Sequence, residues 1–125
     1  MKRIISLLLA VMTVFTLAAC GTKDTTVNAQ GLAQALLEKT SFDAELTAVP
    51  NEELGYYFQL PAKCDAAAYM SSGSTAEEIF VIECYDGTSA AALRTSMQAF
   101  LDSQKTEMER YLPAEADRIN GAIFE

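Results

Sequence analysis

Length, charge and residue types exclude several classes of protein at the outset. The chain has 125 residues, with 17 acidic against 9 basic side chains and no histidine. Without histidine it lacks the commonest general base, the commonest metal ligand and any Ser-His or Cys-His nucleophile pair. A net charge of −8 argues against nucleic-acid binding through a basic surface. We also expect no metal and no other cofactor.

The chain begins with the pattern of a cleaved export signal. Lys2 and Arg3 provide a positive start, and residues 4–19 follow without a charge. This run is shorter than the roughly 20 apolar residues of a membrane-spanning helix, and it ends in small residues. Residues 1–19 are therefore predicted to be a signal peptide.

The end of this run, Leu17-Ala18-Ala19-Cys20-Gly21, resembles the lipobox of bacterial lipoproteins. The resemblance implies cleavage before Cys20 and a diacylglyceryl group on its thiol. Two acyl chains anchor a protein stably, whereas one does so only marginally. We therefore expect the mature protein on the outer face of the cytoplasmic membrane, held by lipid on Cys20, in a Gram-positive envelope. The alternative is a plain secretory signal followed by a chance cysteine.

The mature chain divides into a tether and one domain. Residues 20–30 are polar and are predicted to be flexible, and residues 31–125 suffice for a single domain with a modest core. Loss of Lys2 and Arg3 leaves seven cations against 17 anions, a net charge of −10. We interpret this acidity as keeping an exported domain soluble.

Two helices are predicted in the first half of the domain. Residues 30–40 place Leu32, Leu36 and Leu37 at helical spacing. A second, short helix is expected to start at residues 50–53, where two acids occupy the first turn.

A β-hairpin is predicted next, with strands at residues 64–71 and 77–85 and a turn rich in Ser and Gly between them. A hairpin symmetric about Ser74 sets small residues opposite large ones, which supports this register. The facing pairs are then Ser71 and Glu77, Ala68 and Phe80, Ala66 and Ile82, and Cys64 and Cys84.

The last part of the chain predicts a long helix, a short helix and a strand. Residues 86–89 break the preceding strand and offer N-cap oxygens, and the long helix is expected at residues 89–110. Pro113 ends it and opens a short helix through Asn120. Ile123 and Phe124 would begin a third strand. The predicted fold is α+β: a small antiparallel sheet, made of the hairpin and this C-terminal strand, with the helices packed on one face.

The segment from Tyr69 to Ile79, together with Tyr111-Leu112-Pro113, resembles the small-lipoprotein family known as domain of unknown function 4358. The resemblance covers nearly all of residues 30–125. The family has no established activity, so it implies no functional residues. Its members continue past the position of Ile123 with a further strand, which points to a C-terminal truncation here and an uncovered sheet edge.

Cys64 and Cys84 allow three interpretations. The predicted register sets them opposite each other, and a disulfide would persist outside the cytoplasm. We favour this structural disulfide over two buried free thiols. Redox chemistry is the weakest option, because the two residues do not form a Cys-x-x-Cys motif.

Aromatic residues are the best binding candidates. Tyr56 and Tyr57 precede Phe58 and stand near a glycine and a proline, a setting found at recognition surfaces; Tyr69 is a further candidate. The alternative is that these rings cover the sheet or pack against the long helix.

We predict a non-catalytic binding or interaction module whose partner is an envelope protein, a peptide or a small ligand. One alternative is an enzyme that uses carboxylates or Tyr69 on envelope material. Adjacent acids such as Glu77 and Glu78 diverge on a strand, so they suit paired catalysis poorly. The other alternative is a structural or assembly factor that acts through its sheet edge.

Overall fold

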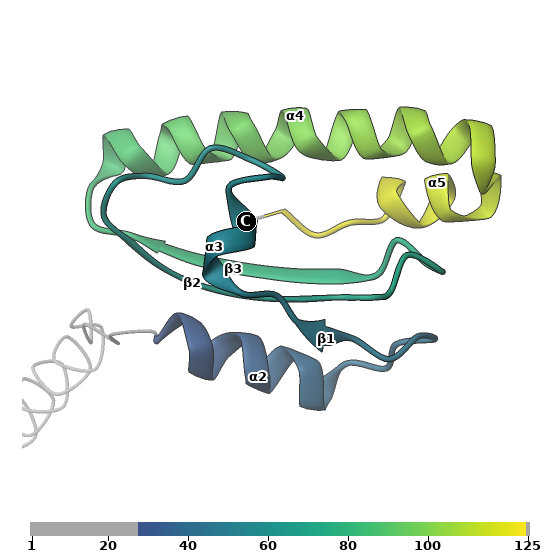
Figure 1. Ribbon diagram of the computed structural model, residues 1–125, viewed down its shortest axis with the longest axis horizontal. Coiled ribbons are helices and arrows are strands. Elements are labelled where there is room, and N and C mark those ends of the chain that lie inside the picture. The colour runs from purple at the N-terminus through teal and green to yellow at the C-terminus, as the bar shows by residue number, and fades with distance from the viewer. Residues whose placement is uncertain (1–27, 125) are drawn as a thin grey trace, which may run out of the picture.

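The structure is a computed structural model that describes residues 28–124 (Figure 1). The predicted signal peptide, Cys20 and the tether up to residue 27 lie outside the described residues, as does Glu125. The elements in chain order are α2 (Ala29–Lys39), β1 (Thr47–Ala48), α3 (Asn51–Leu54), β2 (Cys64–Met70), β3 (Glu78–Cys84), α4 (Gly87–Tyr111) and α5 (Pro113–Asn120). A three-stranded antiparallel sheet combined with these helices confirms the α+β class.

The hairpin of β2 and β3 has the predicted register. Cys64 faces Cys84, Ala66 faces Ile82, and Ala68 faces Phe80. Beyond the strands, the Ser71 N–H donates to the Glu77 carbonyl oxygen at 3.1 Å. Gly73 adopts a φ of 92° in the connecting turn, a left-handed conformation that glycine tolerates without a steric cost.

The third strand differs from the predicted one. It is β1, which pairs with β2 through Thr47 and Met70 and through Ala48 and Tyr69, in the order β1-β2-β3. Such a short, exposed strand has no periodic pattern to reveal it. The expected strand at Ile123 is wrong, because residues 122–124 are irregular.

Arg94 explains why the C-terminal tail does not join the sheet. Its Nη2 donates to the Phe124 carbonyl oxygen at 3.3 Å. Its guanidinium also lies 4.7 Å from the centroid of the Phe124 ring, within the range of a cation–π contact. These contacts hold the tail against α4.

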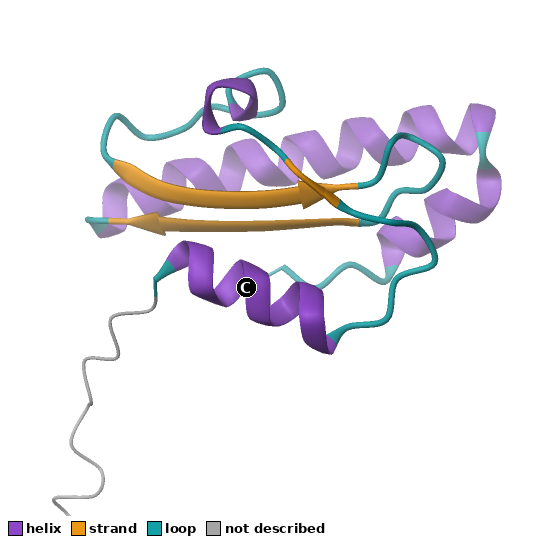
Figure 2. Ribbon diagram, turned by 60° about the horizontal axis from the view of Figure 1, so that its bottom comes forward, coloured by secondary structure: helices purple, strands orange, loops and turns teal. Residues whose placement is uncertain are grey.

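Helices cover both faces of the sheet, so the prediction that they pack on one face is wrong. Figure 2 shows α2 in front of the strands and α4 behind them. Ala67 and Ile79 belong to a buried cluster with Ala33 of α2 and with Leu46, whereas the alternate positions Phe80 and Ile82 face the α4 side. Successive side chains of a strand point to opposite faces, and the hairpin carries apolar side chains on both faces. Burying each apolar face away from water is favourable, so a helix packs on each side.

The helix boundaries follow from local capping. Asp86 accepts a hydrogen bond from the Ser89 N–H at 2.7 Å and so starts α4 two residues before the predicted position. Pro113 begins α5, which folds back beneath the end of α4 (Figure 1). Asn28 caps α2, so residues 29 and 30, assigned above to the tether, belong to a helix.

Aromatic rings join α3 to the sheet and to α4. Phe58 and Phe80 have centroids 5.2 Å apart, and Phe100 of α4 lies 5.9 Å from each of them. Tyr57 lies 5.8 Å from Phe100. Edge-to-face pairs of this kind stabilise by about 0.5–1.5 kcal/mol beyond the area they bury. Leu54, the last residue of α3, precedes these rings in the chain and is fully buried.

Candidate functional site

A cavity of about 790 Å³ lies between the sheet and α4. Its apolar wall comes from one face of β3 and from the stripe of α4, and includes Phe80, Ile82, Leu93, Met97, Phe100 and Leu101. Residues 121–124 and part of α5 complete the lining. The volume falls in the range of small-molecule sites, about 300–1,000 Å³.

The cavity exists because the two faces of the sheet are filled unequally. On the α2 side, Ala33 is 0% exposed and Ala67 is 4% exposed, so the helix and the sheet are in close contact. On the α4 side, Phe80, Ile82 and Met97 are only half-buried. Apart from the contact between Phe80 and Phe100, the apolar stripe of α4 therefore faces apolar strand residues without filling the space between them.

Two polar side chains from opposite walls meet in this lining. Glu78 begins β3, and Gln104 lies in the second half of α4. The Gln104 Nε2 donates to the Glu78 Oε2 at 3.2 Å. The Gln104 Oε1 is buried and has no hydrogen-bond partner among the residues that the structure describes. This pair therefore retains unused acceptor capacity.

Burial raises the pKa of Glu78 to about 7, although the hydrogen bond from Gln104 opposes the shift. Desolvation disfavours the charged form of a carboxyl group. A carboxyl in an apolar cavity that exchanges its proton near neutral pH is a candidate functional group.

Glu77, by contrast, is engaged in a structural network. It is 7% exposed and accepts hydrogen bonds from the Asp43 and Ala44 N–H groups at 2.8 Å. The Arg118 Nη1 donates to it at 2.7 Å, and Arg118 also pairs with Asp43 at 2.8 Å and with Glu115 at 3.1 Å. These bonds join α5 to the sheet and to the loop after α2.

The pKa of Glu77 moves in the opposite direction. Burial alone would raise it, but the two backbone N–H groups, the Thr75 hydroxyl and the Arg118 charge together hold it below its ordinary value. Its carboxylate therefore stays ionised at neutral pH and holds α5 in place as part of the cavity wall.

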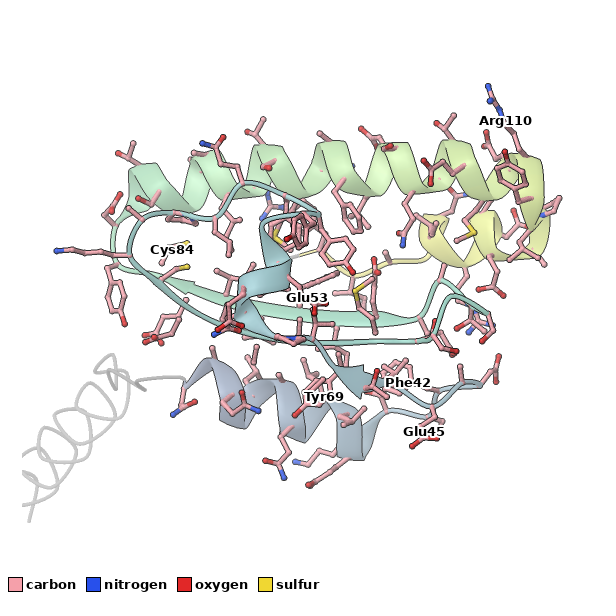
Figure 3. The ribbon with its side chains drawn as sticks, viewed as in Figure 1. Phe42, Glu45, Glu53, Tyr69, Cys84 and Arg110 are labelled. Atoms are coloured by element: carbon pink, nitrogen blue, oxygen red, sulfur yellow. The ribbon has the colours of Figure 1, made fainter. Side chains whose placement is uncertain are left out.

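The tyrosines proposed from sequence are not brought together. Tyr56 is 86% exposed, whereas Tyr57 packs against Phe100. Tyr69 packs against the α2-side cluster, and its hydroxyl oxygen accepts from Gln30 Nε2 at 3.2 Å. Figure 3 shows Tyr69 on the α2 side of the sheet and Cys84 on the opposite side. None of these tyrosines lines the cavity.

Cys64 and Cys84 face each other across the hairpin and are free thiols in this structure. Facing Cα atoms of antiparallel strands lie about 4.5–5.5 Å apart, within the range that a disulfide spans. Burial raises the pKa of both thiols, and Asp65 adds to the effect at Cys64. The disulfide stays a prediction.

Our sequence reasoning missed the cavity and the pair of Glu78 and Gln104, although a signal was present. Glu78 shares its alternation with Phe80 and Ile82, so it had to lie on the same face of β3. Gln104 follows Phe100 by four residues, so it lies on the apolar side of α4. Polar residues inside apolar stripes were the available clue.

Comparisons with protein-family models, with curated proteins and with solved structures found no match to this chain. Within residues 28–124, no group of His, Cys, Asp and Glu side chains is arranged to hold a metal ion. The same stretch contains no helix that is both long enough and apolar enough to cross a bilayer.

Proposed function

We propose that this protein is a lipid-anchored extracytoplasmic binding module that holds a small apolar molecule between β3 and α4. The cavity of about 790 Å³ carries this proposal. It has an apolar wall with a small polar pair, which is the usual composition of a small-molecule site.

The same site supports binding better than catalysis. The carboxylate enzyme considered above needs a second acid or base near the first. Glu77 is adjacent, but its oxygens are taken up by Arg118, by two backbone N–H groups and by the Thr75 hydroxyl. Of these two adjacent carboxyl groups, Glu78 is the one that accepts a single side-chain hydrogen bond in residues 28–124.

The proposed setting comes from the first 20 residues. The charged start, the uncharged run and the lipobox-like sequence before Cys20 support export and acylation. The polar stretch after Cys20 would hold the domain close to the outer face of the membrane. The resemblance to the family known as domain of unknown function 4358 belongs to this proposal.

Assembly through the sheet edge is a second candidate. Strand β3 has a strand neighbour on one side only in the described part of the chain, and β1 covers just the end of β2. Unpaired strand edges are templates for pairing with another chain. Concentration-dependent association in analytical ultracentrifugation would favour this candidate, and a monomer at all concentrations would reject it.

A fluorescence titration tests the binding proposal. The mature chain from residue 20, with Cys20→Ser so that it carries no acyl group, contains every described element. We expect the neutral probe N-phenyl-1-naphthylamine to bind saturably, with an increase in fluorescence as it enters the apolar cavity.

Two alanines of α4 provide a matched pair of variants. Ala91 lines the cavity and is exposed, whereas Ala92 is exposed and does not line it. Ala91→Trp should obstruct the cavity and weaken probe binding several-fold, while Ala92→Trp should not. Absence of saturable binding, or equal binding by the two variants, would refute the proposal.

A further inference from the structure

We propose that the cavity selects apolar molecules that carry a protonated amine, and that this amine pairs with Glu78. This inference rests on the proposed binding function and goes further, because it names the chemical class of the ligand. Its basis is a buried carboxyl with a single side-chain hydrogen bond and an unpartnered amide oxygen next to it among apolar side chains, with no ion pair to Glu78 in residues 28–124.

The geometry gives such a ligand an orientation. Glu78 stands at the start of β3, and Phe80 and Ile82 follow on the same face. Four residues of strand extend about 13 Å. Across the cavity, Met97 and Phe100 of α4 provide apolar wall, and the Phe100 ring touches that of Phe80, with centroids 5.9 Å apart. An alkyl or aryl body would lie beside this ring contact, against residues 121–124, with its polar head at Glu78.

None of the charged groups around the cavity forms an ion pair with Glu78 in the described part of the chain. From α5, Arg118 is engaged by three carboxylates, among them the neighbouring Glu77. From α4, Arg94 lies against Phe124. The other titratable group in the lining is Cys84, at the far end of β3. Gln104 donates the one hydrogen bond that Glu78 receives from side chains in residues 28–124.

An ammonium group would provide the positive charge and the hydrogen-bond donors that Glu78 and Gln104 lack. Burying a carboxylate without a counter-charge is costly, and an N–H donor of a cation forms a short, strong bond to it. An ammonium has three donors, so it can serve Glu78 and the unpartnered Gln104 Oε1 together. A carboxylate ligand at this position would meet the Glu78 carboxylate and the Gln104 Oε1, which repel it, on a protein of net charge −8.

The state of Glu78 gives this selection a pH dependence. Burial places its pKa at about 7, whereas an alkylamine stays protonated up to about pH 10. Above neutrality the cavity therefore presents a carboxylate to the ammonium. As the pH falls through about 7, Glu78 takes up a proton and the attraction is lost.

Three ligands with the same tail test the proposal. Octylamine, octanol and octanoate would be titrated by calorimetry into the unacylated mature chain at about pH 8, where Glu78 is ionised. We expect octylamine to bind about tenfold more tightly than octanol, because a charge-assisted bond replaces a neutral one, and octanoate to bind most weakly. At about pH 5 the advantage of octylamine should disappear.

A pair of variants separates Glu78 from the overall negative charge. Glu78→Gln should make octylamine and octanol bind equally. Glu83→Gln removes the same charge from the other face of β3 and should leave the preference intact. The pH series on the unmodified chain gives an independent measurement should Glu78→Gln alter the fold.

The outcomes distinguish this inference from the proposed function. Saturable octanol binding without an octylamine preference, or a preference that survives Glu78→Gln, overturns the amine selection and leaves the apolar cavity standing. Failure of N-phenyl-1-naphthylamine and of all three ligands to bind overturns both.

Discussion

Two adjacent carboxyl groups, those of Glu77 and Glu78, lie in environments of opposite electrostatic character. Glu77 is surrounded by N–H donors and Arg118, which outweigh its burial and lower its pKa. Glu78 faces apolar side chains, and burial raises its pKa to about 7. Its ionisation therefore lowers stability as the pH rises through 7, because the folded state binds the extra proton.

Glu77→Gln should lower the free energy of unfolding by about 2–3 kcal/mol at neutral pH, because it removes the buried carboxylate that pairs with the partly exposed Arg118 and leaves backbone N–H donors with a weaker acceptor. The folded-state pKa of Glu77 lies below its ordinary 4.5, so its stabilisation is present above that pH and is lost as the pH falls through the folded value. The difference between variant and parent should therefore shrink in acid. Urea unfolding followed by circular dichroism at a series of pH values measures it.

Glu107→Gln is the control for this experiment. Glu107 is exposed on α4, and such surface changes stay within about 0.5 kcal/mol. An equal loss in both variants, or a loss at Glu77 that does not depend on pH, would contradict the role assigned to the network.

The hairpin of β2 and β3 is the element on which the rest of the fold is assembled. It is apolar on both faces, so α2 covers one face and α4 faces the other. The small residues of β2 lie opposite large ones of β3, as in the pair of Ala68 and Phe80. The same register brings Cys64 and Cys84 to facing positions near the open end of the hairpin.

We predict that Cys64 and Cys84 form a disulfide in the exported protein. Non-reducing mass spectrometry should then find the chain two hydrogens lighter than its reduced form. For a loop of this length the bond should add about 3 kcal/mol to the free energy of unfolding. Two free thiols in protein taken from the envelope would refute this prediction.

Replacing both cysteines with serine controls for the loss of their packing. The doubly substituted chain should match the reduced parent, and not the oxidised one, in urea unfolding. A stability equal to that of the oxidised parent would show that no bond contributes.

At the scale of the whole molecule, residues 28–124 form three layers, with α2 on one side of the sheet and α4 and α5 on the other (Figures 1 and 2). On this side of the sheet, the network at Arg118 joins α5 to the residue before β3, and the contact of Phe80 with Phe100 joins α4 to β3. Arg118 belongs to α5 and Phe100 to α4, and both residues line the cavity of about 790 Å³.

We predict that the whole protein is anchored to the membrane through lipid on Cys20. Cys20→Ala should release the protein from the membrane fraction, because two acyl chains on that sulfur are the proposed anchor. Immunoblotting of membrane and soluble fractions measures the release, and Cys64→Ala serves as the control. Retention of Cys20→Ala in the membrane fraction would refute the lipobox interpretation.

Local patterns in the sequence determined the elements and the hairpin. Apolar spacing predicted α2 and α4, Pro113 marked the start of α5, and small-to-large pairing gave the register of β2 and β3. Each of these depends on residues that are near one another in the chain, where periodicity and capping act directly.

Only the tertiary structure decided the rest, because it depends on contacts between distant residues. The two-residue strand β1 forms where the chain meets β2, and the tail at Phe124 is held by Arg94. Glu77 is paired by a residue 41 positions away. The cavity results from the spacing of whole layers, which no local pattern encodes. Local sequence patterns thus determined the helices and the hairpin, whereas long-range packing determined the third strand, the course of the tail and the position of the cavity.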